Sequence, residues 1–306
     1  MNNDPLPKLQ FRLLGTPQLY QAGVVHVGLT AAKAQALLSY LAMTASTGRT
    51  THTRAALATL LWGECGEAEA RGNLRKVIQH LREQLDPYLT FENQTVGLRT
   101  PHLYTVDAVD FAAALADPRT AALDQLQAAI AQYHGDFLEG FYVRDAPDFE
   151  AWMLGERARL RELMLQGVET LALRYAGQGD LPQAITTARS LLALEPWREE
   201  MHRQLMTWLA QNGQRSAALA QYELCQRALA EELAVEPSDA TRDLYERLLR
   251  QDATDPQIPL HSAPVEYALV GRQQAWQTLR TAWRQVRQTG THFVCIAGEA
   301  GIGKTR

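Results

Sequence analysis

Residues 68–99 read AEARGNLRKVIQHLREQLDPYLTFENQTVGLR, and this stretch decides the fold of the N-terminal part of the chain. Its first part predicts a helix from Ala68 to Leu85, because apolar side chains recur there at helical spacing on one stripe: Leu74, Val77, Ile78, Leu81 and Leu85. Asp86-Pro87 ends that helix. Two strand-like runs then flank residues 92–94, and they predict a β-hairpin.

The residues before this stretch predict a small antiparallel sheet and two shorter helices. Strand character runs through residues 8–15, 18–21 and 24–27, with a turn signal at Ala22-Gly23. We expect Thr30 to cap the first helix and Thr53 to cap the second, since a threonine hydroxyl accepts from the free N–H groups of a helix start. Three helices followed by a hairpin predict a winged helix-turn-helix domain over residues 1–104, whose third helix enters the major groove of DNA.

The third helix carries polar side chains opposite its apolar stripe. Arginine, lysine, asparagine and glutamine offer donors that fit base edges and phosphates, so we expect groove contacts from Arg71, Asn73, Arg75, Lys76 and Gln79. Residues near helix N-termini or at the groove flank are expected to contact phosphates: Thr30, Lys33, Thr53, Arg54 and Arg82. The hairpin would contribute a wing contact through Asn93, Gln94 and Arg99.

The charge balance favours a polyanionic partner for the N-terminal domain alone. Residues 1–100 hold ten Lys and Arg against seven Asp and Glu, although the whole chain has a net charge of -4. The same side chains also fit an ordinary solvated helix face, and Glu83 on the presumed DNA face would repel phosphate.

The eight histidines show no metal-ligand spacing, and His52 and His80 are expected at exposed positions.

Residues 105–251 are almost entirely helical in pattern and contain an internal repeat. Gly179 recurs as Gly213, and Ala184 recurs as Ala218 at the same offset. Small residues at this period are typical of tetratricopeptide-like helix pairs, which stack to hide their apolar faces. Such arrays are commonly binding platforms, and a purely structural spacer or dimerisation body is the alternative.

Several separated blocks, in order, resemble the SARP-type bacterial transcriptional activators. They include KAQALLSYLA at residues 33–42, YHGDFLEG at 133–140 and ELAVEPSDATRDLY at 232–245. The resemblance extends over residues 8–250 and implies an OmpR-like winged helix joined to a bacterial transcriptional activator domain. It also implies binding to double-stranded promoter DNA as side-by-side protomers, hence a homodimer on DNA, and contact with RNA polymerase. Larger members of that group continue into a STAND-type or AAA-like ATPase.

The C-terminal residues predict a proline-rich linker over 252–267 and the start of a P-loop domain over 268–306. An apolar run at residues 292–297 precedes G-x-x-x-x-G-K-T, whose backbone N–H groups would cradle phosphates. The expected phosphate contacts are Gly298, Gly301, Gly303, Lys304 and Thr305. Thr305 would also hold Mg²⁺ in an intact ATPase. The expected contacts on the base side are Val270, Gly271 and Arg272. So short a module cannot bury a nucleotide, so it is either the front of a longer ATPase or vestigial. We therefore expect no cofactor for this chain alone, and ATP with Mg²⁺ in a full-length protein.

Together these patterns predict a mainly α protein: an N-terminal α+β winged helix-turn-helix, an all-α tetratricopeptide-like domain, and the truncated start of a P-loop α/β domain. Three scattered cysteines, no secretion signal and no apolar run of membrane-span length favour a cytoplasmic protein. No nucleophile and base are paired in the pattern, so we expect no enzyme. The expected function is sequence-specific transcriptional regulation. The main rival is a signalling STAND-type ATPase whose N-terminal domains dock proteins, and an inducer site in the helical domain ranks lowest.

Overall fold

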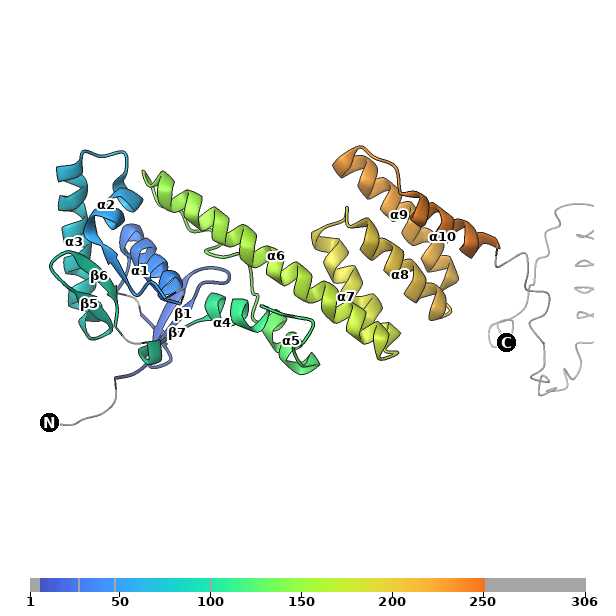
Figure 1. The fold of residues 1–306 in the computed structure, drawn as a ribbon, viewed down its shortest axis with the longest axis horizontal. Coiled ribbons are helices and arrows are strands. Elements are labelled where there is room, and N and C mark those ends of the chain that lie inside the picture. The colour runs from blue at the N-terminus through green and yellow to red at the C-terminus, as the bar shows by residue number, and fades with distance from the viewer. Residues whose placement is uncertain (1–5, 27, 47, 100, 251–306) are drawn as a thin grey trace, which may run out of the picture. The chain divides into compact units, whose positions relative to one another are not determined.

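A computed structural model describes residues 6–250 apart from residues 27, 47 and 100 (Figure 1). A four-stranded sheet forms first, in the order β3-β2-β1-β7. Its strands are β1 (Leu9–Arg12), β2 (Gln18–Gln21), β3 (Val24–Val25) and β7 (Tyr104–Val106). Strands β1, β2 and β3 pair antiparallel, as predicted, and Ala22-Gly23 turns between them with φ values of 53° and 80°. The parallel pairing of β7 with β1 was not predicted.

Three helices and a second sheet complete the winged-helix arrangement. The helices are α1 (Ala32–Ala45), α2 (Arg54–Trp62) and α3 (Glu67–Leu85), and a 3₁₀ turn, η1 (Asp86–Tyr88), follows α3. The sheet has the order β4-β6-β5 and consists of β4 (Thr51–Thr53), β5 (Leu89–Phe91) and β6 (Thr95–Leu98). The predicted third helix and hairpin are therefore confirmed.

Strand β4 approaches β6 so closely that only glycine fits at one position. A Cβ atom added to Gly97 would lie 2.0 Å from the backbone oxygen of Thr50, closer than such atoms can stand. Gly97 pairs with Thr51 in the antiparallel register of these strands. The missing side chain therefore allows the wing hairpin to be joined to the segment that leads into α2.

The rest of the described chain is helical. After a second 3₁₀ turn, η2 (Pro101–Leu103), and β7, it contains α4 (Asp107–Ala114), α5 (Leu123–Ala131), α6 (Pro147–Gly177), α7 (Leu181–Leu194), α8 (Glu199–Gln211), α9 (Arg215–Leu233) and α10 (Asp239–Arg250). Helix α7 packs on α6 and on α8, and α9 packs on α8. The mainly α architecture with small N-terminal sheets agrees with the prediction from sequence.

The 34-residue repeat has a structural counterpart. Gly179 and Gly213 each end a helix with positive φ, 82° and 73°, a conformation that favours glycine. Ala184 and Ala218 are both fully buried near the start of the following helix. Each repeat unit is therefore a helix, a glycine turn and a second helix that approaches closely through alanine.

Partly buried hydrogen bonds connect the N-terminal sheet to the helices that follow it. The carboxylate of Asp107, the first residue of α4, accepts from the backbone N–H groups of Leu13 at 2.8 Å and Leu14 at 3.1 Å. Arg157 on α6 donates to the carbonyl oxygens of Phe137 and Leu138, each at 3.0 Å, and the Leu138 N–H donates to the Leu13 carbonyl, just after β1, at 2.8 Å. The expected domain boundary at residue 104 falls inside β7, and the boundary itself stays a prediction.

Candidate nucleic-acid interface

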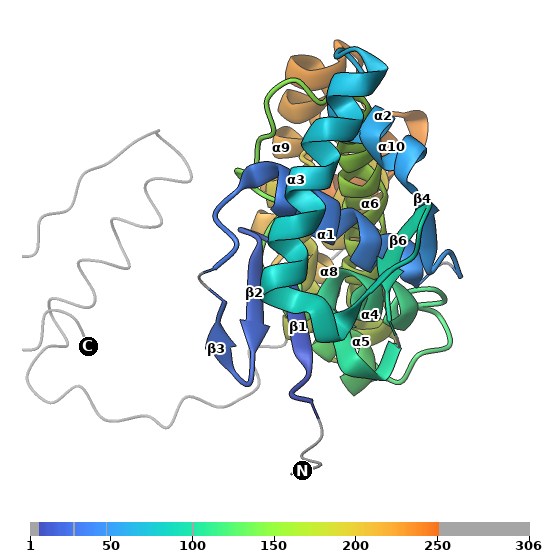
Figure 2. The same cartoon turned by 90° about the vertical axis from the view of Figure 1, so that its left-hand side faces the viewer.

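Helix α3 has one buried side and one exposed side. Ala70, Leu74, Ile78, Leu81 and Leu85 are buried, and α3 packs against α1, α2 and η1. Viewed end-on, α3 stands at the front of the molecule, and no described element lies over it (Figure 2). Within the described part of the chain, the outward side of α3 is therefore uncovered.

The polar residues predicted for this side are mostly exposed, while Asn73 is half-buried. Arg75 and Lys76 have no hydrogen-bond or ion-pair partner among the described residues, so their charges are available to a ligand. Arg71 pairs with Glu67 one turn earlier, and the Gln79 amide donates to Glu83 at 3.2 Å. Because exposed pairs of this kind contribute at most about 1 kcal/mol, a phosphate or a base can replace them.

A depression of about 270 Å³ lies where α3, the start of α2 and the wing turn meet. Six of the thirteen predicted contact residues line it: Thr53, Arg54, Arg71, Arg75, Asn93 and Gln94. They come from three segments separated in sequence, so folding gathers them in one place. The depression thus joins the exposed side of α3 to the wing.

The wing turn is fixed to α2 by Arg54. Its guanidinium donates to the Glu92 carbonyl at 3.0 Å, and its backbone N–H donates to the Gln94 carbonyl at 2.8 Å. Thr53 caps α2 as predicted, accepting from the Ala56 N–H at 3.3 Å. Asn93 and Gln94 remain exposed at the tip of the turn. Arg54 therefore positions the wing and keeps only part of its donor capacity for phosphate.

Two further arginines flank the hairpin. The Arg82 guanidinium lies 4.6 Å from the ring centre of Phe91 and 3.9 Å from Asp86. Arg99 donates to the Leu89 carbonyl at 3.4 Å and is exposed. Stacking on Phe91 holds the Arg82 charge at the junction of α3 and the wing.

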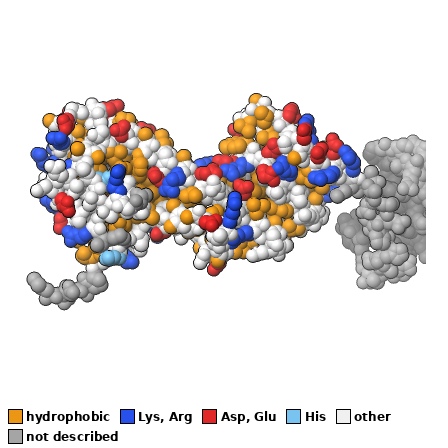
Figure 3. All heavy atoms as spheres, viewed as in Figure 1, with side chains coloured by type: hydrophobic (Ala, Val, Ile, Leu, Met, Phe, Trp, Pro, Cys, Tyr) orange, Lys and Arg blue, Asp and Glu red, His pale blue; other side chains and the backbone are white. Residues whose placement is uncertain are grey.

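The interface is mixed in charge. Glu67 and Glu69 lie in the first turn of α3, where carboxylates stabilise the helix dipole but repel phosphate. Figure 3 shows red and blue side chains interspersed at the end of the molecule where Figure 1 places α3. Attraction to a polyanion therefore depends on the particular side of α3 that bears Arg75 and Lys76.

Two expectations about the start of α1 were wrong. Ala31, not Thr30, occupies the cap position of α1, and no side chain caps that helix. Lys33 is not free to meet phosphate: its ammonium donates to the carbonyls of Leu61 and, at 2.9 Å, Asp145.

Burial lowers the pKa of Lys33, against the opposing effects of Asp145 and Cys65. The Lys33 ammonium also lies 4.9 Å from the ring centre of Trp62. These contacts connect α1 with the end of α2 and with the segment before α6. Lys33 therefore joins elements within the fold, a role that depends on a partner 112 positions away.

His52 is buried, not exposed. It lies between the Tyr40 ring, 5.0 Å from its own ring centre, and the Thr44 hydroxyl, 2.8 Å from its Nε2 atom. Burial lowers the pKa of its imidazole. His80 is half-buried, and its Nε2 atom has no partner within the described residues.

The predicted nucleotide contacts Val270, Gly271, Arg272, Gly298, Gly301, Gly303, Lys304 and Thr305 lie outside the described residues. Within residues 6–250, no cluster of three or more His, Cys, Asp or Glu side chains is arranged to hold a metal ion. No helix in the described part of the chain is long and apolar enough to cross a membrane.

Residues 106–249 match the family model of the bacterial transcriptional activator domain. The chain is also similar to the regulatory protein AfsR of Streptomyces coelicolor, with 28% identity over 97% of this chain and 30% of AfsR. The transcriptional regulatory protein MoaR1 of Mycobacterium bovis is 27% identical over 79% of this chain and 80% of MoaR1.

A solved structure of Mycobacterium tuberculosis EmbR, in complex with a low-affinity phosphopeptide, shares the fold. It has a TM-score of 0.60 and 24% identity, covering 80% of this chain and 66% of that one. The chain spans less than a third of the length of the AfsR proteins that it matches. By their names, AfsR and MoaR1 are regulatory proteins.

Proposed function

We propose that this chain is a sequence-specific DNA-binding transcriptional activator whose helix α3 enters the major groove. The proposal rests mainly on one observation. The outward side of α3 presents Arg75 and Lys76, which have no partner among the described residues, next to a depression shared with the wing. The bacterial transcriptional activator domain at residues 106–249 and the regulatory relatives support a role in transcription.

Base reading and phosphate binding are assigned to different residues. Base contacts fall to Arg71, Asn73, Arg75, Lys76 and Gln79, with Arg75 best placed because its planar guanidinium can meet guanine through two donors. Phosphate contacts fall to Thr53, Arg54 and Arg82, and wing contacts to Asn93, Gln94 and Arg99. Lys76, a flexible point charge, can also swing to a neighbouring phosphate.

The helical domain is proposed to contact RNA polymerase or a second copy of this chain. Its stacked helix pairs expose apolar side chains, including Leu194 and Leu224, which are 45% and 48% exposed. Repeat arrays of this kind present extended surfaces to other proteins. In a longer protein, Lys304 and Thr305 would bind ATP and Mg²⁺.

Selection of bound duplexes from a random pool tests the DNA-binding proposal. We expect a recurring sequence to be enriched and its affinity to depend on salt. If about four cationic side chains meet phosphates, affinity should fall roughly 100-fold between about 50 and 200 mM salt. Recovery of no sequence, and no duplex binding at low salt, would favour the protein-docking rival.

A further inference from the structure

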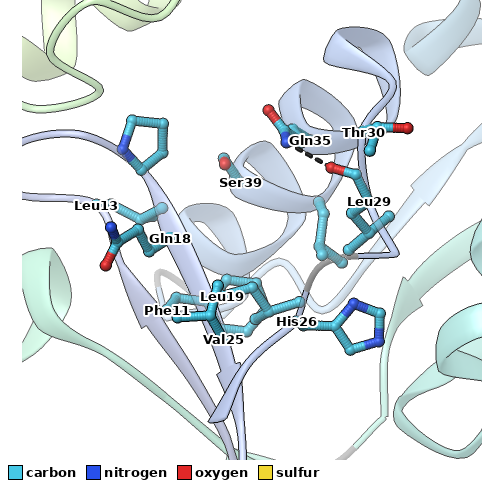
Figure 4. A pocket seen from close by; sticks show the side chains of 12 residues that line it. Phe11, Leu13, Gln18, Leu19, Val25, His26, Leu29, Thr30, Gln35 and Ser39 are labelled. Carbon is cyan, nitrogen blue, oxygen red and sulfur yellow. Dashed lines mark hydrogen bonds between the residues drawn. The ribbon is translucent and has the colours of Figure 1, made fainter.

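A cavity of about 380 Å³ lies between the N-terminal sheet and α1, apart from the proposed DNA interface. Figure 4 shows side chains from the strands facing side chains of α1 across it. Its apolar wall includes Phe11, Leu13, Leu19, Val25, Leu29 and Leu38. A cavity of this size accepts a small organic molecule but not a helix or a folded partner.

One polar side chain of α1 lines this cavity without a hydrogen-bond partner among the described residues. Ser39 on α1 is only 6% exposed, and its hydroxyl has no hydrogen-bond partner among the described residues. Thr44, five residues further along α1, instead donates to the Tyr40 carbonyl at 2.7 Å. Because the hydroxyl opens into the cavity and has no partner within the described residues, a ligand can hydrogen-bond to it in place of water.

The remaining polar side chains in the wall define the charge of the ligand. Gln18, His26, Thr30 and Gln35 also line the cavity, and the Gln35 amide already donates to the Leu29 carbonyl. Among the described residues that line it, none is Asp, Glu, Lys or Arg. The wall therefore lacks a fixed counter-charge, and a charged ligand would lose hydration without compensation.

We propose that this cavity binds a small, neutral, mostly apolar organic molecule that makes one hydrogen bond to the Ser39 hydroxyl. The binding site lies in the winged-helix domain rather than in the helical domain. It does not depend on the DNA-binding proposal, because binding can be measured in the absence of DNA.

N-phenyl-1-naphthylamine is a suitable probe, since it is neutral, carries a phenyl and a naphthyl group joined by one N–H donor, and fluoresces more strongly out of water. Titration into the 306-residue protein should give saturable enhancement with one site per chain. Ser39→Phe should abolish that enhancement by filling the cavity. Ser39→Ala should weaken binding about two- to tenfold, the loss expected for one hydrogen bond.

Two further variants keep the test decisive. Gln18→Trp, on an exposed strand position at the cavity edge, should also block the probe and covers the case in which Ser39→Phe fails to fold. Leu224→Ser alters a separate apolar depression between α7, α8 and α9 and should leave binding unchanged. The proposal is wrong if no saturable binding occurs, if Ser39→Ala or folded Gln18→Trp binds like the unmodified protein, or if Leu224→Ser abolishes binding.

Discussion

The carboxylate of Asp107 should be a main support of the junction between the first sheet and the helical domain. It accepts from three backbone N–H groups: Leu13 at 2.8 Å, Leu14 at 3.1 Å and Ala108 at 2.7 Å. Leu13 and Leu14 are 2% and 5% exposed, so water does not readily replace the lost acceptor. Asp107→Ala would leave these donors without their partner.

The change in the free energy of unfolding depends on two opposing contributions, the lost hydrogen bonds and the desolvation of the carboxylate. Hydrogen bonds to a charged group contribute about 1.5–3 kcal/mol each, so three of them set an upper bound of about 5–9 kcal/mol. Burial raises the pKa of Asp107 even though the three N–H groups act to lower it, so desolvation offsets much of that gain. We therefore expect Asp107→Ala to lower the free energy of unfolding by about 2–4 kcal/mol.

Urea unfolding followed by far-ultraviolet circular dichroism measures this difference. Asp110→Ala is the matched control, because Asp110 is an exposed acid on the same helix with no hydrogen bond among the described residues. Its free energy of unfolding should stay within about 0.5 kcal/mol of that of the unmodified protein. If Asp107→Ala and Asp110→Ala unfold at the same urea concentration, the three hydrogen bonds do not support the junction.

Two further predictions concern the wing and the helical domain. Gly97→Ala should destabilise the protein by about 1–3 kcal/mol, because the added Cβ would collide with the Thr50 carbonyl. The control Gly72→Ala, on α3 with open space around it, should stabilise the protein by about 0.5–1 kcal/mol. Equal urea unfolding midpoints for the two variants would contradict the close approach of β4 and β6. Burial acts to raise the pKa of Glu199, but hydrogen bonds from Ser238 and Thr241 hold that pKa below its ordinary value of 4.5. The contribution of Glu199 to stability is therefore complete above pH 4.5 and is lost as the pH falls through the lower folded-state pKa. Acid titration of unfolding should therefore show a smaller loss of stability below pH 4.5 for Glu199→Gln than for the unmodified protein, and identical curves would count against these hydrogen bonds.

The parts of the fold that could be predicted are those with a long or repeated pattern. Helix α3 was evident because its apolar side chains return every three or four residues over 19 positions. The repeat was evident because Gly179 and Gly213 must adopt positive φ to end a helix, which constrains residue type at fixed spacing.

The parts that could not be predicted depend on contacts between distant residues. Strand β4 has three residues, too few for an alternating pattern, and it forms only because β6 lies beside it. His52 is polar by residue type but buried through Thr44 and Tyr40. Local sequence gives no sign of either partner.

The candidate interface also has residues that could be predicted from sequence and residues that could not. The exposed residues of α3 follow from helical periodicity, so Arg75 and Lys76 could be chosen from sequence. Lys33 could not be excluded, because its partner Asp145 lies beyond any local pattern. The depression that gathers α2, α3 and the wing turn is a product of tertiary packing alone.

The central claim is that the exposed side of α3 reads DNA, and paired substitutions on that side test it most directly. Gel-shift affinities are measured for a selected duplex and for its single-base variants, at several salt concentrations. Arg75→Ala should cost about 1–3 kcal/mol and relax discrimination at one base pair, whereas Lys76→Ala should weaken all duplexes alike and reduce the salt slope by about 1. Arg227→Ala, an exposed cation of α9, should change neither quantity. Unchanged affinity and salt slope in both α3 variants would contradict the account.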